Sequence, residues 1–498
     1  MTRKPNLMTR RSVVTGVLTA AGSGVLAATP ETTPRPRPRP NLQKLAVAAA
    51  EPRSSRSAAL VRGANLSGAV GFSVADADTG EVLEARLGGT ALPPASTLKV
   101  VTALYAIDRL GGNHQFQTRV LATGPIVNGR LDGDLILVGG GDPTLDTDRL
   151  ADLAKALSEA GITEVTGRFL LWPGALPRGK RIDLEQPDHV AYNPSYGGLN
   201  LNFNRVHFQW KKARDSYDIT MHARSRNFSP STSVARMSII ERKSPVFEYR
   251  DWGSRDQWSV ADWALAKDGA RWLPVRYPAL YAGDVFRTLA RSYGIVLKPA
   301  EIMAAVPEAQ EIASVSSEGL VPMIQNMLKF STNLTAEATG LTASTTFGAV
   351  EDLEASGACM AGWCMANFGV AGMRFVDHSG LGYGSQISPN GLAAIMARNS
   401  GVAPLLKPVN LSKESAAQSK GVLVRAKTGT LNFVSSLAGI VTNPKGRDLA
   451  FSILTADTER RDAVPTEQRE RPPGARGWAN RSRRLQRELI AEWIAQYG

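Results

Sequence analysis

Residues 94–107 read PASTLKVVTALYAI, in which a serine and a lysine three positions apart begin an apolar run. The apolar residues recur at spacings of three and four, which predicts a helix with one buried face. Ser96 then lies in the first turn, where backbone N–H groups are unpaired, and Lys99 lies one turn later on the same face. A serine hydroxyl becomes a strong nucleophile when an adjacent base takes its proton. The same pattern is also typical of an ordinary helix start, with Ser96 as a cap.

Two further short motifs follow in the chain. Ser331-Thr332-Asn333 has the form S-x-N, and Lys427-Thr428-Gly429 has the form K-T-G at the end of an alternating, strand-like run. Each motif alone is compatible with a helix cap or a solvated charge at a strand end. Together with Ser96 and Lys99, they follow the order S-x-x-K, S-x-N, K-T-G, which is that of penicillin-binding proteins and class A β-lactamases.

On these motifs the chain resembles a penicillin-binding protein. It is most similar to the D-alanyl-D-alanine carboxypeptidases/endopeptidases of low-molecular-mass class C, the PBP4-type group or peptidase family S13. Further likeness lies in residues 133–145, 199–204 and 376–381. The resemblance implies an α/β (α+β) fold of the penicillin-recognising transpeptidase and β-lactamase kind, with an antiparallel sheet flanked by helices. It also implies a large insertion of one or two small domains.

The resemblance implies a role for each motif residue. Ser96 would attack the penultimate carbonyl carbon of a D-Ala-D-Ala peptide, and Lys99, held neutral by partial burial and by the nearby Lys427 cation, would take its proton. Ser331 would relay a proton to the leaving amine, and Asn333 would position Lys99. The residues that would bind the substrate and its carboxylate are Lys427, Thr428, Gly429 and Thr430. This chemistry needs no metal or cofactor.

One element departs from the family pattern. Asp377 and Ser379 resemble a D-x-S-G-L element, but His378 occupies the position where that pattern usually has glycine. His378 is open to two interpretations, a base or a structural residue, and Lys99 already supplies a base.

The N-terminus has the layout of a bacterial export signal. Arg10 and Arg11 precede an apolar run of small residues, so residues 1–28 are interpreted as a twin-arginine signal for export to the periplasm. Residues 29–60 follow as a Pro/Arg-rich tether and lead-in. The net charge of +13 suits an anionic partner, and export favours an acidic wall polymer over nucleic acid.

Alternating apolar patterns at both ends of the chain predict strands. The patterns cover residues 70–76, 82–85, 436–441 and 449–454, and residues 484–497 form an amphipathic helix. Strands from both termini would share one antiparallel sheet with the K-T-G strand.

The distance between Ser96 and Ser331 exceeds what one helical subdomain needs. We therefore assign residues 61–113 and 278–498 to the transpeptidase-like domain, and residues 114–277 to the inserted domains. Within the insertion we expect a helix at 148–160 and strands at 135–138, 169–172, 199–203 and 206–210.

The chain has two cysteines, Cys359 and Cys364. In an oxidising periplasm they could close a small disulfide loop, whereas within one helix their geometry would be unfavourable and both would be small buried residues.

These observations favour an exported serine D,D-peptidase that removes D-alanine or cleaves D-alanyl cross-links in peptidoglycan. Its partners would be stem peptides and, as inhibitors, β-lactam antibiotics. Peripheral membrane or wall association and a homodimer are compatible with this reading. The alternatives are a β-lactamase, which the long insertion disfavours, and a penicillin-binding scaffold or sensor without turnover.

Overall fold

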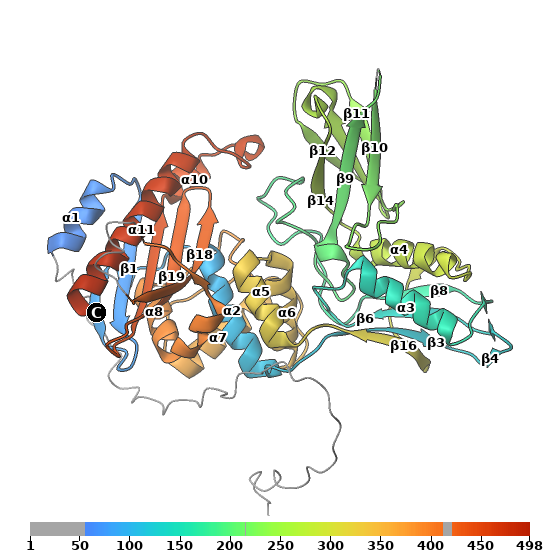
Figure 1. Cartoon of the computed structure of the whole chain (residues 1–498), viewed down its shortest axis with the longest axis horizontal. Helices are drawn as coiled ribbons and strands as arrows, with labels where there is room; N and C mark the ends of the chain where they lie inside the picture. The colour runs from blue at the N-terminus through green and yellow to red at the C-terminus, as the bar shows by residue number, and fades with distance from the viewer. Residues whose placement is uncertain (1–54, 215, 412–420) are drawn as a thin grey trace, which may run out of the picture. The chain divides into compact units, whose positions relative to one another are not determined.

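Strands from both ends of the chain form one antiparallel sheet, as the alternating patterns predict. The computed structural model describes residues 55–214, 216–411 and 421–498. The sheet has the order β17-β18-β19-β20-β1-β2 (Figure 1). Its strands are β1 (Ala69–Asp76), β2 (Val82–Arg86), β17 (Lys407–Pro408), β18 (Leu423–Leu431), β19 (Val434–Thr442) and β20 (Leu449–Ala456). The N-terminal strand β1 pairs with the C-terminal strand β20, with Phe72 opposite Ile453.

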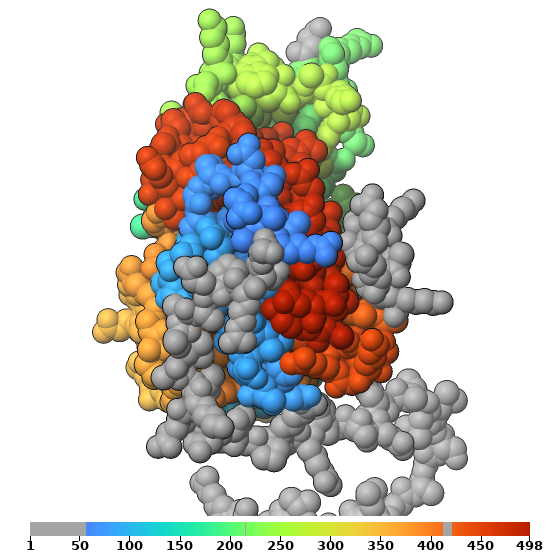
Figure 2. Space-filling model, turned by 90° about the vertical axis from the view of Figure 1, so that its left-hand side faces the viewer, coloured from blue at the N-terminus to red at the C-terminus, as the bar shows by residue number. Residues whose placement is uncertain are grey.

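The two faces of this sheet bury different helices. One face packs against α11 (Ala475–Tyr497) and α1 (Ser55–Gly63), with the Trp493 ring 5.5 Å from that of Phe72. Figure 2 shows the blue N-terminal helix lying against the red C-terminal helix. The opposite face packs against α8 (Pro389–Arg398) and α2 (Leu98–Leu110). Because side chains alternate along a strand, one sheet supports both cores.

A helical part adjoins the sheet and carries the second motif. Its helices are α5 (Leu320–Phe330), α6 (Asn333–Thr345) and α7 (Leu353–Phe368), whereas the short α10 (Thr458–Asp462) follows β20. Helix α5 ends at Ser331, which has the left-handed conformation (φ 59°, ψ 39°) common at helix C-termini. Helix α6 begins two residues later and packs against α2, so the motifs on α2 and α6 come together.

The inserted region begins with a second sheet, of order β15-β8-β6-β3-β16. Its strands are β3 (Gln117–Ala122), β6 (Leu135–Gly139), β8 (Phe169–Trp172), β15 (Ala300–Ile302) and β16 (Gln310–Ser316). Helices α3 (Thr147–Glu159) and α4 (Pro278–Ser292) cover it, and a small sheet of β4 (Ile126–Val127), β5 (Arg130–Leu131) and β7 (Glu164–Val165) lies at its edge. The predicted helix at 148–160 and strands at 135–138 and 169–172 are therefore present.

Two three-stranded sheets complete the inserted region. One has the order β10-β9-β14 and the other β11-β13-β12. The strands are β9 (Arg205–Lys212), β10 (Tyr217–His222), β11 (Ala235–Ile240), β12 (Phe247–Asp251), β13 (Asp256–Ala261) and β14 (Gly269–Pro274). One continuous apolar core joins these sheets to α3 and α4.

The structure corrects two of our sequence expectations here. The insertion was expected to end at residue 277, but β16 pairs with β3, so the second sheet closes only at Ser316. The expected strand at 199–203 is a loop that leads into a 3-10 turn at Asn202–Asn204, where three successive residues have positive φ. Such a backbone cannot pair as a strand.

Both cysteines lie in α7 as free thiols, so the disulfide alternative does not hold. Their five-residue separation along one helix keeps the two sulfurs apart. The export signal and most of the tether fall outside the described residues, although residues 55–60 of the lead-in already belong to α1. Within the described ranges, no helix has the length and apolar character required to cross a bilayer.

Candidate active site

Ser96 lies in a 3-10 turn, Ala95–Thr97, that leads directly into α2. Two hydrogen bonds hold the Pro94 carbonyl in place. Thr97 Oγ1 donates to it at 2.6 Å, and Ser436 Oγ on β19 donates at 2.5 Å. Ala95 has φ +46°, a conformation that costs energy for a residue with a Cβ atom. The fold thus holds a strained turn at the predicted nucleophile, while Ser96 itself stays half-buried.

Lys99 is fully buried, and its ammonium nitrogen contacts three oxygens. Lys99 Nζ lies 3.0 Å from Ser96 Oγ, 2.7 Å from Asn333 Oδ1 and 2.7 Å from the Ser379 carbonyl oxygen. Burial lowers the pKa of Lys99, because a low-dielectric environment disfavours the charged form. The neutral amine is the form that can accept the Ser96 proton, so the geometry and the pKa shift favour the same role.

Two buried carboxyl groups lie behind Lys99. Glu337, one turn after Asn333 on α6, accepts hydrogen bonds from the backbone N–H groups of His378 at 2.8 Å and Ser379 at 3.0 Å. Asp377 accepts from Gly380 N at 2.9 Å. Burial raises the pKa of both carboxyl groups, and their negative charge opposes the lowering of the Lys99 pKa.

Ser331 and Lys427 form a second pair. Lys427 Nζ, on β18, donates to Ser331 Oγ at 3.0 Å and to the Thr428 carbonyl at 2.7 Å. Only 3% of Lys427 is exposed. Burial, followed by repulsion from Lys99 and Lys407, lowers the pKa of Lys427 to about 6. Of the two expected causes of a neutral Lys99, burial does lower its pKa, whereas the Lys427 cation is not among the causes of the shift.

The K-T-G strand passes close to the Ser96 turn. A Cβ atom on Gly429 would lie 2.8 Å from the Pro94 carbonyl oxygen and 2.9 Å from Ser96 N, so only glycine fits there. The flanking side chains of Thr428 and Thr430 are exposed. The backbone of β18 and the N–H of Ser96 therefore line one small volume.

Tyr192 brings the inserted region into the site, and the motifs did not reveal it. Its backbone carbonyl accepts a hydrogen bond from Asn333 Nδ2 at 2.7 Å, and this bond fixes the amide so that Oδ1 faces Lys99. An apolar cluster of Leu176 and Tyr196 with Leu334 and Leu341 lies beside this contact. Glu337 was missed too, although its spacing of four residues from Asn333 places both on one helix face.

His378 packs behind the site as a structural residue. Its ring is fully buried, with Nε2 2.7 Å from Ser356 Oγ and its plane stacked on Tyr105. Burial lowers the pKa of His378 to about 3. A Cβ atom on Gly340 of α6 would lie 2.1 Å from the imidazole, so Gly340 makes room for this ring.

The five motif residues that we predicted as catalytic therefore form two linked contacts. In the first group, Lys99 bonds to Ser96 and Asn333. In the second, Lys427 of β18 bonds to Ser331. The sequence profile of the D-Ala-D-Ala carboxypeptidase 3 (S13) family matches residues 57–471. The chain belongs to this family.

The chain is also similar to a named carboxypeptidase in sequence and to solved structures in fold. A D-alanyl-D-alanine carboxypeptidase of Actinomadura sp. (strain R39) is 28% identical over 433 residues, which cover 78% of each chain. Penicillin-binding protein 4 from Haemophilus influenzae has a similar fold, with a TM-score of 0.72 at 21% identity over 89% of this chain and 100% of that one. A second crystal structure of the Haemophilus protein, in complex with a β-lactam, gives a TM-score of 0.69 at 20% identity over the same shares. The expected transpeptidase-like fold and family are thus confirmed.

Proposed function

We propose that this S13 chain is a serine D,D-peptidase that cleaves D-alanyl-D-alanine termini, D-alanyl cross-links, or both, in peptidoglycan. The observation that carries the proposal is the 3.0 Å contact between Ser96 Oγ and the buried amine of Lys99. This distance lies within the reach of a general base. Family membership and the carboxypeptidase name of the Actinomadura relative supply the substrate class.

The first half of the reaction forms an acyl-enzyme. Ser96 Oγ attacks the penultimate carbonyl carbon while Lys99 Nζ takes the hydroxyl proton. The resulting oxyanion is stabilised by the backbone N–H groups of Ser96 and Thr430. The C–N bond to the last D-alanine then breaks, and Ser331, paired with Lys427, relays to the departing amine the proton that Lys99 took from Ser96, which returns Lys99 to its neutral form. Water hydrolyses the ester and regenerates the Ser96 hydroxyl.

Lys427 has a binding role as well. Its pKa of about 6 means that the empty site holds a largely neutral amine at pH 7. A substrate carboxylate placed beside it favours the ammonium form, so carboxylate binding takes up a proton. The exposed Thr428 and Thr430 hydroxyls add hydrogen bonds to the same carboxylate.

We infer that the enzyme acts outside the cytoplasm, on the wall polymer, and that β-lactams acylate Ser96. The basic N-terminal signal pattern supports export, by the twin-arginine route in our interpretation. The β-lactam complex of the Haemophilus protein supports inhibition by this class of drug. Peripheral wall association and homodimer formation stay as predictions.

Intact-mass spectrometry after exposure to benzylpenicillin tests the proposal. We expect one penicilloyl adduct on the wild type, none on Ser96→Ala, and an unchanged adduct on the control Ser254→Ala, which alters an exposed serine. Release of D-alanine from a synthetic stem peptide should disappear with Ser96→Ala. An unmodified protein with intact drug would indicate a scaffold, and an unmodified protein with hydrolysed drug a β-lactamase.

A further inference from the structure

A pocket of about 430 Å³ lies on the inserted region, formed by β9, β10 and the loop that follows β10. The side chains that matter for its chemistry are His207, Gln209, His222, Arg224, Arg226 and Asn227. None of these belongs to the candidate active site. The pocket is therefore a separate feature that the peptidase reaction does not use.

The floor of the pocket holds two histidines on neighbouring strands. His207 and His222 are directly opposite in the antiparallel pair β9–β10, so their side chains share one face. His207 is only 7% exposed and touches the Trp272 ring, yet within the described ranges its imidazole makes no hydrogen bond or ion pair. His222 Nδ1 donates to the Ser229 carbonyl at 3.1 Å, so its Nε2 is left as a hydrogen-bond acceptor.

Two arginines add fixed positive charge. Arg224 and Arg226 are exposed, and neither guanidinium has a carboxylate partner among the residues that the structure describes. Burial, followed by repulsion from Arg224 and His222, lowers the pKa of His207. The two guanidinium groups thus line one volume, and the charge of Arg224 disfavours a protonated His207.

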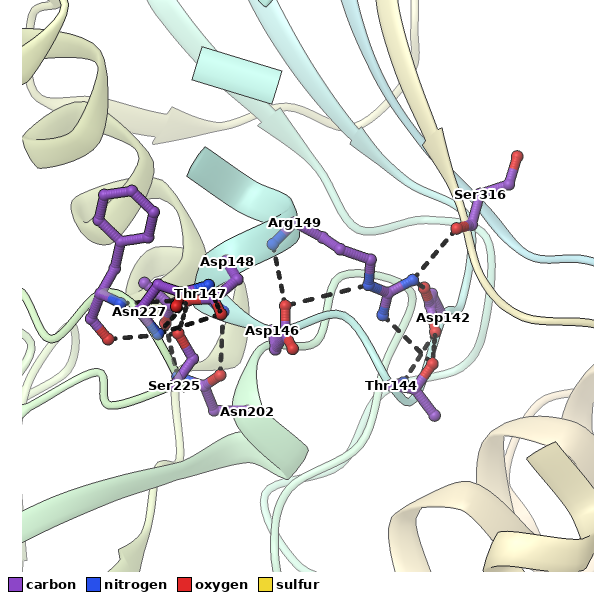
Figure 3. A network of polar contacts seen from close by, with 11 residues as sticks. Asp142, Thr144, Asp146, Thr147, Asp148, Arg149, Asn202, Ser225, Asn227 and Ser316 are labelled. Carbon is purple, nitrogen blue, oxygen red and sulfur yellow. Dashed lines mark hydrogen bonds and ion pairs between the residues drawn. The ribbon is translucent and has the colours of Figure 1, made fainter. Parts of the chain in front are cut away.

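The loop that carries these arginines is fixed in place. Asp148, in the first turn of α3, accepts hydrogen bonds from Ser225 Oγ, from Asn227 N at 3.1 Å and Nδ2 at 3.0 Å, and from Phe228 N at 3.2 Å (Figure 3). Its carboxylate is therefore occupied by the loop. A pocket whose loop is already ordered loses less conformational entropy when it binds a ligand.

We propose that this basic pocket binds a phosphate group. Each guanidinium offers a planar fork of N–H donors that matches phosphate oxygens. A phosphate has enough oxygens to accept bonds from the two arginines and from the N–H of His207 at once, whereas a carboxylate has only two. The ligand is either a soluble phosphate or one unit of a phosphodiester polymer, and the experiment below separates these sources.

The test is isothermal titration calorimetry of the full chain with inorganic phosphate at low ionic strength. We expect saturable binding to the wild type and binding at least about tenfold weaker for R224Q/R226Q. The control R236Q/K243Q removes the same charge from exposed positions outside the pocket and should bind as the wild type does. A second titration with poly(glycerol phosphate) identifies the source, because tighter binding per phosphate indicates the polymer and equal or weaker binding indicates a soluble phosphate.

Absence of saturable binding, or an equal loss in the pocket and control variants, overturns the proposal. The unfolding midpoint of each variant checks its fold. If R224Q/R226Q does not fold, the phosphate affinity of His207→Gln is compared with that of the wild type instead. Phosphate binding is tested independently of the peptidase function. R224Q/R226Q should release D-alanine from a small soluble peptide as the wild type does, whatever its phosphate affinity.

Discussion

The helix side of the active site and its strand side each bury one lysine, and the two lysines differ in their surroundings. Lys99 lies among an amide oxygen, a carbonyl oxygen and, further back, the carboxyl groups of Glu337 and Asp377. Lys427 lies beside Ser331 and experiences repulsion from Lys99 and Lys407. Burial of the two lysines thus has different consequences: the fold places two carboxyl groups behind Lys99, whereas, among the described residues, Lys427 has only cations as charged neighbours.

The largest effect should come from the helix side. Replacing Lys99 by alanine removes the proposed base, so kcat/KM for a D-Ala-D-Ala peptide should fall by about 10²–10⁴-fold. Penicillin acylation of Ser96 should slow by a similar factor in a mass-spectrometric time course. Lys155→Ala, which changes an exposed side chain of α3, serves as the control and should retain wild-type rates. Near-normal acylation of Lys99→Ala would show that another group takes the proton.

The strand side should show a smaller loss that depends on the substrate. A charge-assisted hydrogen bond contributes about 1.5–3 kcal/mol, so Lys427→Met should lower kcat/KM about 10–100-fold for a free carboxylate. For the C-terminal amide of the same peptide, the wild type and the variant should differ much less. Lys445→Met is the matched control, because Lys445 is exposed in the turn between β19 and β20. Equal losses on acid and amide would contradict carboxylate recognition by Lys427.

The carboxyl group behind Lys99 can be tested without changing the motifs. Glu337→Gln keeps the shape of the side chain but weakens its two hydrogen bonds to the 378–379 backbone, at an expected cost of about 1–3 kcal/mol in the free energy of unfolding. Urea denaturation measures this loss. Glu318→Gln, at an exposed position, should leave stability unchanged. A stable Glu337→Gln protein would mean that the turn is held mainly by Asp377.

The smallest effect should be a pH dependence of stability on the strand side. Lys427 has a pKa of about 6 when folded and about 10.4 when unfolded, so between these values the unfolded chain binds more protons at this site. The contribution of Lys427 to the free energy of unfolding therefore rises with pH, by at most about 1.4 kcal/mol per unit. Comparing urea midpoints at pH 6.5 and 8.5 should show a flatter profile for Lys427→Met than for the wild type. Identical profiles would argue against this proton linkage.

The sequence predicted the parts of the molecule that local patterns encode. The spacing of Ser96 and Lys99 placed both on one side of a helix start, and period-two alternation located β1, β19 and β20. The period of the apolar residues cannot show which strand completes an inserted sheet. The last strand, β16, pairs with β3, which lies almost two hundred positions earlier in the chain. For this reason the boundary at 277 was placed too early.

The same limit applies inside the site. Glu337 could have been found from its spacing to Asn333, but a glutamate in a helix is usually solvated, and only burial reveals its function. Tyr192 acts through its backbone carbonyl, which every residue possesses, so no side-chain motif could have identified it. The surroundings of His378 likewise depend on Gly340, which lies on α6, far from His378 in the sequence.

The contact between Tyr192 and Asn333 has a consequence for attempts to shorten the enzyme. Deleting the insertion and joining its ends would strip the Asn333 amide of its acceptor and expose Leu334 and Leu341 to water. The long insertion thus holds a residue of the candidate active site in place and is not a detachable module. When insertions are exchanged between relatives, turnover should therefore be preserved only if the loop around Tyr192 and α6 are taken from the same protein.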